Sequence, residues 1–223
     1  MKEAMIYDTN IYQLRDYVLT RMLEIISNQR HHQKGGIVFY GDSITQMFDV
    51  NKYILDLGHV YNCGIAGITS SVLLNFIDEG VIKYEPSQVV IMVGTNDLGN
   101  TVMASPRDIA LNIKEMVELI HYNLPHCKIH VVSPIPCLEK LHGYKATPGI
   151  RSNDMLKMIY KECQQMIRYD YVDFINVYPL LCNKKGQPIE EYYIDGLHIN
   201  DKAYQIYAKV LKESLGENNA TIL

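Results

Sequence analysis

Two patterns of apolar side chains alternate along this chain of 223 residues. Stretches with apolar side chains three and four positions apart predict amphipathic helices, whereas shorter continuous apolar runs predict strands that are buried on both faces. The predicted helices cover residues 10–29, 69–82, 107–124, 152–169 and 200–215. The predicted strands cover residues 36–40, 59–62, 87–94, 128–136 and 172–177.

Polar and conformationally special residues mark the ends of these elements. Asn10 is the expected cap of the first helix, and Thr69 or Ser70 that of the second, because short polar side chains accept hydrogen bonds from free N–H groups at a helix start. Ser105 followed by Pro106 is typical of the beginning of the third helix. Glycine, serine and proline follow the apolar runs, so each strand has a defined end.

The alternation of strands and helices predicts the fold class. Parallel strands that are joined through helices form right-handed crossovers, which place helices on both faces of the sheet. We therefore predict an α/β fold with three layers, α/β/α, around a central parallel sheet of about five strands. No linker-like segment divides the chain, so we predict a single domain over residues 1–223, with the helix at about 10–29 packed on its core.

Composition and charge exclude several classes of partner. The net charge of -4 and the scattered lysines and arginines provide no basic surface for nucleic acid or anionic membrane. The most apolar early segment is interrupted by Arg21 and Glu24, so we expect no membrane span and no export signal. Five cysteines, an odd number without any C-x-x-C spacing, indicate neither a disulfide framework nor a zinc site and favour the cytoplasm.

Reactive side chains follow the predicted strands. Ser43 comes directly after the first strand, Gly64 after the second and Asn96 after the third, while Asp195 and His198 precede the last helix. Ligands of parallel α/β sheets bind beyond the carboxyl ends of the strands, where loops diverge and helix N-termini point outward. The sequence therefore predicts a site at this edge that contains a serine, a histidine and an aspartate.

The segments that carry these residues resemble a known family. "GDSIT" at 41–45, "NCGIAG" at 62–67, "GTND" at 94–97 and "DGLHIN" at 195–200 are similar, in this order, to the sequence blocks of the SGNH hydrolases, the GDSL-type esterase and lipase superfamily. The layout is also similar to the branch that contains the catalytic subunits of platelet-activating-factor acetylhydrolase. The resemblance implies a flavodoxin-like sheet and a serine esterase that forms an acyl-enzyme without a metal or an organic cofactor.

Carried over position by position, the resemblance assigns a role to each residue. Ser43 is the expected nucleophile, His198 the general base and Asp195 the group that orients the imidazole; a serine hydroxyl needs such partners to become nucleophilic. The expected oxyanion hole consists of the Ser43 N–H, the Gly64 N–H and the side-chain amide of Asn96. The supporting residues Asp42 and Asp97 are interpreted as acceptors that fix their loops.

Substrate and assembly are less well defined by the sequence. The preferred substrates are short-chain, acetyl esters of small molecules or sugars, selected by the segments 47–53 and 137–151 at the rim of the pocket. A long-chain lipase or lysophospholipase and a thioesterase stay open as alternatives with the same machinery. Less favoured are an inactive binding module and a metal-dependent phosphoesterase that would use Asp42, Asp97, Asp195 and His198 as ligands. A homodimer also stays open.

Overall fold

The computed structural model of the protein describes residues 15–99 and 104–217. Within these residues one sheet contains β1 (Ile37–Gly41), β2 (Val60–Gly64), β3 (Gln88–Met92), β4 (Lys128–Val132) and β5 (Val172–Ile175). The strand order is β2-β1-β3-β4-β5, and every neighbouring pair is parallel. The prediction of a central parallel sheet of about five strands in a flavodoxin-like arrangement is confirmed.

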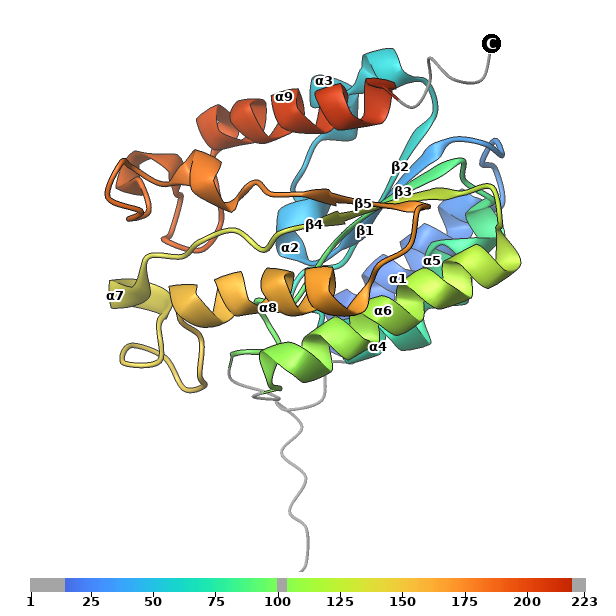
Figure 1. The fold of residues 1–223 in the computed structure, drawn as a ribbon. Helices are drawn as coiled ribbons and strands as arrows, with labels where there is room; N and C mark the ends of the chain where they lie inside the picture. The colour runs from blue at the N-terminus through green and yellow to red at the C-terminus, as the bar shows by residue number, and fades with distance from the viewer. Residues whose placement is uncertain (1–14, 100–103, 218–223) are drawn as a thin grey trace, which may run out of the picture.

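Helices cover both faces of this sheet (Figure 1). On one face lie α3 (Val50–Tyr53) and α9 (Asp201–Glu217). Two further short helices are α2 (Ser43–Gln46) and α7 (Glu139–His142). The other face carries α1 (Asp16–Gln29), α4 (Ser70–Asn75), α5 (Ile77–Gly80), α6 (Pro106–Asn123) and α8 (Asn153–Met166). Single 3₁₀ turns occupy Leu55–Leu57, Ile82–Tyr84, Tyr178–Leu181 and Glu190–Tyr192. No helix within the described residues combines the length and the apolar character needed to cross a membrane.

The strands divide their side chains between two hydrophobic cores. In β1, Val38 and Tyr40 join the core beneath α1, α4, α5, α6 and α8, whereas Ile37 and Phe39 join the core beneath α9. This division follows from the alternation of side chains along a strand. Both faces are therefore apolar, which explains the continuous apolar runs in the sequence.

A predicted helix start agrees with the structure where the capping residue is close in sequence to the N–H groups that it binds. At the start of α6, Ser105 accepts a hydrogen bond from the N–H of Asp108, and the Asp108 carboxylate accepts one from the N–H of Ser105. The prediction that this helix begins at Ser105 and Pro106 is confirmed. The predicted cap of the first helix, Asn10, lies outside the described residues, as does the part of that prediction before residue 15.

The prediction of one helix over residues 69–82 was wrong. The segment contains α4 and α5, separated at Phe76, and then a 3₁₀ turn. The side chain of Thr69 does not cap α4; instead Asp97, from another part of the chain, accepts hydrogen bonds from the N–H of Ser70 at 3.0 Å. A cap supplied from 27 positions away cannot be read from local sequence. That residues 1–223 form a single domain stays a prediction.

Candidate active site

Ser43 is the first residue of α2, directly beyond the carboxyl end of β1. The turn is tight, because a Cβ built on Gly41 would lie only 2.2 Å from the carbonyl oxygen of Met92. Asp42 caps α2, and its Oδ1 accepts a hydrogen bond from the N–H of Ile44 at 3.0 Å. The serine, only 5% exposed, is therefore held at the edge of the sheet where parallel α/β folds bind ligands.

A loop before α9 brings a histidine and an aspartate to this serine. The loop is closed by an antiparallel bridge between Tyr193 and Ile199. Inside it, Nδ1 of His198 lies 2.7 Å from Oδ2 of Asp195, and Nε2 of His198 lies 3.0 Å from Oγ of Ser43. The structure thus joins the three predicted side chains in one chain of hydrogen bonds.

Asp195 keeps its negative charge in this arrangement. Burial opposes the charge, but hydrogen bonds from the His198 ring and from the N–H groups of His198 and Leu197 lower the pKa of Asp195 well below its usual value. The N–H donors bind Oδ1 at 2.8 and 2.9 Å, which leaves Oδ2 for the imidazole. A fixed anion at Nδ1 selects the tautomer in which Nε2 of His198 accepts a proton.

The two supporting aspartates are buried acceptors. Burial raises the pKa of Asp42 from its ordinary 3.8 to about 7, although the hydrogen bond from Ile44 and the nearby His198 oppose this effect. Burial also raises the pKa of Asp97, against the hydrogen bonds from the N–H and the hydroxyl of Ser70. Each carboxyl group fixes the start of a helix, Asp42 that of α2 and Asp97 that of α4. These contacts agree with their interpretation as acceptors that hold loops.

The predicted oxyanion donors differ in their availability. The amide Nδ2 of Asn96 donates to the carbonyl of Ile68 at 3.0 Å, which occupies one of its two hydrogens. The N–H of Gly64, in contrast, donates to the side-chain Oδ1 of Asn62 at 2.9 Å. Gly64 therefore does not offer the free donor that the sequence interpretation required.

A second glycine of the same motif offers what Gly64 lacks. Among the described residues no acceptor contacts the N–H of Gly67, and the same holds for the N–H of Ser43. Gly67 has a φ of 73°, a region that favours glycine, and it lies next to Ile68, whose carbonyl holds the Asn96 amide. The sequence interpretation missed Gly67. The motif "NCGIAG" contains two glycines, so both could have been considered as oxyanion donors.

The segment 137–151 contacts the loop that carries the histidine. The N–H of Leu138 donates to the carbonyl of Gly196 at 2.8 Å, and Nε2 of His142 lies 3.0 Å from the carbonyl oxygen of Asp195. The segment 47–53 contains α3, where Lys52 and Tyr53 bind the carboxylate of Asp201 at the start of α9. Whether the two segments select the substrate stays a prediction.

The residues that a metal-dependent alternative would need do not form a ligand cluster. In the part of the chain that the structure describes, no three His, Cys, Asp or Glu side chains converge in a way that could hold a metal ion. Asp97 is instead bound to Ser70, and Asp195 to His198. This geometry favours nucleophilic chemistry at the serine.

Comparison with known proteins gives consistent results. A family model described as the GDSL-like Lipase/Acylhydrolase family matches residues 39–206. The chain is 25% identical over 181 residues to platelet-activating factor acetylhydrolase IB subunit alpha2 of Gallus gallus, a match that covers 79% of this chain and 74% of the chicken protein. The Homo sapiens protein of the same name is 31% identical over 126 residues, 55% of this chain and 53% of the human protein. That match spans about half of the human protein's length.

Solved structures share the fold over most of the chain. A structure from Streptococcus pneumoniae, provisionally described as a platelet activating factor, superposes with a TM-score of 0.78 at 26% sequence identity. The superposition covers 90% of this chain and 95% of the Streptococcus pneumoniae chain.

Proposed function

The chain belongs to the GDSL-like lipase/acylhydrolase family and is a hydrolase of carboxylic esters, and from this we propose that Ser43 attacks the substrate and forms an acyl-enzyme. The observation that carries the proposal is the hydrogen-bonded series from Asp195 through His198 to Ser43. A serine hydroxyl is a weak nucleophile until a base within hydrogen-bond reach removes its proton, and the imidazole is such a base.

Each of the three side chains has one task in the proposed reaction. Oγ of Ser43 attacks the ester carbonyl carbon while Nε2 of His198 takes its proton. The anionic Asp195 stabilises the resulting imidazolium through Nδ1 and holds the ring in place. The imidazolium then gives its proton to the departing alcohol, and the acyl group stays on Ser43. Water repeats the sequence on the acyl-enzyme, which releases the acid and restores the serine.

For the oxyanion hole we propose three donors: the N–H of Ser43, the N–H of Gly67 and the side-chain amide of Asn96. Gly67 takes the place of Gly64 because the N–H of Gly64 is already bound to Asn62. Donors that are fixed before the reaction stabilise the developing negative charge without reorganisation, which makes them worth about 10²- to 10³-fold in turnover each. The contact between Asn96 and the carbonyl of Ile68 supports this arrangement, because it ties two of the donor loops together.

Short acyl groups, acetyl above all, on small alcohols or sugars are the proposed substrates. The names of the chicken and human relatives state an acetyl group as what those proteins remove. The segment 137–151 is placed to shape the site, because Leu138 and His142 fasten it to the loop that carries His198. A long-chain lipase, a lysophospholipase or a thioesterase would use the same three side chains and differ in this surrounding wall.

A fluorophosphonate probe tests the nucleophile directly. Intact-mass analysis of the wild type should show one added probe per chain, located on Ser43 by peptide mapping, and the Ser43→Ala protein should remain unlabelled. Hydrolysis of an aryl acetate should persist after dialysis against EDTA. Active wild type without any label on Ser43, or activity that EDTA removes and a divalent metal restores, would contradict the proposal.

A further inference from the structure

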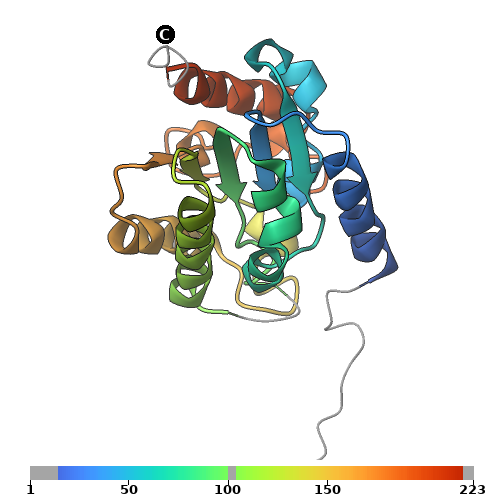
Figure 2. The ribbon, with the colours of Figure 1, turned by 90° about the vertical axis from the view of Figure 1, so that its right-hand side faces the viewer.

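The N-terminal helix α1 binds the segment 62–67, which carries a proposed oxyanion donor, although the helix lies outside the family segment that begins at residue 39. Figure 2 shows α1 at the flank of the molecule beside β2, which is an edge strand of the sheet. Residues 62–67, which form the end of this strand and the loop after it, include both glycines considered for the oxyanion hole. The helix is thus placed to act on the loop that carries a proposed donor.

Arg21 of α1 binds this edge strand through two hydrogen bonds. Its Nε donates to the carbonyl of Gly64 at 3.0 Å, and its Nη2 donates to the carbonyl of Asn62 at 2.7 Å. Carbonyls two positions apart on a strand point to the same side, and those on the outer side of an edge strand have no neighbouring strand as partner. The planar guanidinium, with its side chain only 17% exposed, matches this pair of acceptors.

The same loop is fastened to the helix that begins with the serine. The Asn62 amide donates to the main-chain carbonyls of Thr45 and of Phe48, each at 2.8 Å. Oε1 of Gln46 accepts the N–H of Ala66 at 2.6 Å. These contacts set the distance between the loop and α2, while the arginine holds the loop from α1. The segment 62–66 is therefore fixed by side chains from both helices.

A second residue of α1 contacts the loop at its far end. Tyr17, in the first turn of the helix, has its hydroxyl so close to Gly67 that a Cβ built on this glycine would lie 2.8 Å from it. The helix consequently binds the segment at the strand end through Arg21 and lies close to it again at the proposed donor through Tyr17. A shift of α1 relative to β2 would move both contacts.

We infer that Arg21 is a positioning residue for ester hydrolysis, which holds the segment 62–67 so that the N–H of Gly67 points at the oxyanion. The inference rests on the proposed function. Arg21 touches no reacting atom; it acts through the main chain of Asn62 and Gly64. A misplacement of about 1 Å in a group that serves the transition state can cost about 10²-fold in rate.

Three variants separate this role from general stability. Arg21→Ala should lower kcat about 10- to 100-fold with KM nearly unchanged, because the donor is misplaced in the transition state rather than in substrate binding. Arg21→Lys keeps the charge and the aliphatic stem but cannot form the fork, so it should be intermediate. Glu24→Gln is the matched control: it breaks the exposed ion pair of Arg21 with Glu24, at 3.1 Å, and leaves both carbonyl contacts intact.

Guanidinium ion supplies the decisive measurement. At millimolar concentrations, far below those that unfold proteins, it should restore part of the kcat of Arg21→Ala and have no such effect on the wild type or on Glu24→Gln. Wild-type kcat in a folded Arg21→Ala protein would overturn the inference; if that protein does not fold, wild-type kcat in Arg21→Lys would do so. An inactive wild type whose Ser43 is not labelled would defeat the proposed function itself, so the two failures are distinguishable.

Discussion

Nε2 of His198 lies 3.0 Å from Oγ of Ser43, although 155 positions separate the two residues along the chain. The contact exists because both residues stand at the carboxyl edge of the same parallel sheet, Ser43 after its first strand and His198 in the loop before its last helix. Because all strands are parallel, each one ends at this edge, and each crossover helix carries the chain back to the opposite edge. Reactive groups from distant segments can therefore act as one unit.

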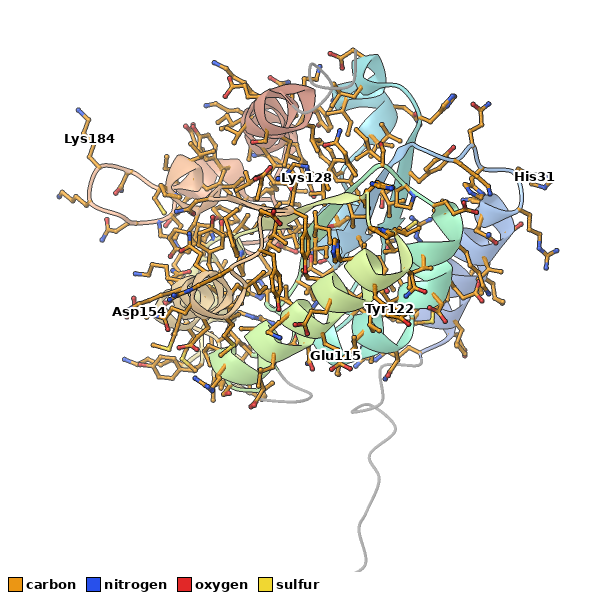
Figure 3. All side chains as sticks on the ribbon, turned by 45° about the vertical axis from the view of Figure 1, so that its right-hand side comes forward. His31, Glu115, Tyr122, Lys128, Asp154 and Lys184 are labelled. Atoms are coloured by element: carbon orange, nitrogen blue, oxygen red, sulfur yellow. The ribbon has the colours of Figure 1, made fainter. Side chains whose placement is uncertain are left out.

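Removal of either residue should abolish turnover without unfolding the protein. Ser43→Ala and His198→Ala are each expected to lower kcat on the order of 10⁴- to 10⁶-fold, because residues that act as a unit lose almost all activity singly. Steady-state kinetics with an aryl acetate measure the loss, and circular dichroism checks the fold. His31→Ala is the matched control, since Figure 3 shows His31 projecting outward beyond α1. Residual activity within tenfold of wild type would refute the assignment.

Asn96 should matter for turnover far more than for binding. Asn96→Ala and Asn96→Asp both remove an amide donor, so each is expected to lower kcat about 10²- to 10³-fold with a small change in KM. Asn123→Ala serves as the control, because the exposed Asn123 amide binds the carbonyl of Leu119 within its own helix, α6. If the Asn96 variants raise KM as strongly as they lower kcat, or change neither, Asn96 is not an oxyanion donor.

Substitution of Gly64 and of Gly67, the two glycines of the segment 62–67, should affect different properties of the protein. A Cβ at position 64 would lie 2.2 Å from the main-chain N of Gln46, so Gly64→Ala should mainly lower the melting temperature. Gly67→Ala strains a backbone with φ of 73° and brings a methyl group to the Tyr17 hydroxyl. We expect this variant to lose kcat beyond its loss of stability. If Gly67→Ala retains full kcat, the Gly67 N–H is not an oxyanion donor.

Asp42 should make stability depend on pH in an unusual direction. Its folded-state pKa is about 7, whereas the ordinary value is 3.8, so the unfolded chain releases this proton first as the pH rises. The contribution of Asp42 to the free energy of unfolding is therefore fully present below about pH 4 and is lost between about pH 4 and pH 7. Asp42→Asn has no proton to release at this position. Denaturant titrations at several pH values should show the wild type losing stability relative to Asp42→Asn across this window; parallel pH profiles would contradict the expectation.

Acyl-chain length should separate the proposed substrate class from its alternatives. With aryl esters of increasing chain length, kcat/KM is expected to fall steeply beyond about four carbons, because the proposed short-acyl site would exclude extra methylene groups that a more open site would bind. The comparison needs substrate concentrations at which every ester remains monomeric in solution. Flat or rising kcat/KM would favour a long-chain lipase or lysophospholipase. A strong preference for thioesters over oxygen esters of equal length would favour a thioesterase.

The local pattern of the chain determined much of this protein. Continuous apolar runs located the five strands within a few residues, because a strand buried on both faces must be apolar throughout. The start of α6 at Ser105 and Pro106 was predicted because a helix cap lies within a few positions of the N–H groups that it binds. The motifs around Ser43, Asp195 and His198 marked residues that the structure brings together, since parallel topology alone sends those loops to one edge of the sheet.

Only the tertiary structure decided which polar groups are already bound. The sequence interpretation chose Gly64 as a donor, but the side chain of Asn62 occupies its N–H and leaves that of Gly67 as the donor for the proposal. The single helix expected over residues 69–82 is divided, and its cap comes from Asp97. The hydrogen bonds from Arg21 to the edge strand β2 could not be predicted from the sequence either. Periodicity and caps are short-range properties of the chain, whereas the satisfaction of a buried N–H or carbonyl depends on partners that folding brings from distant segments.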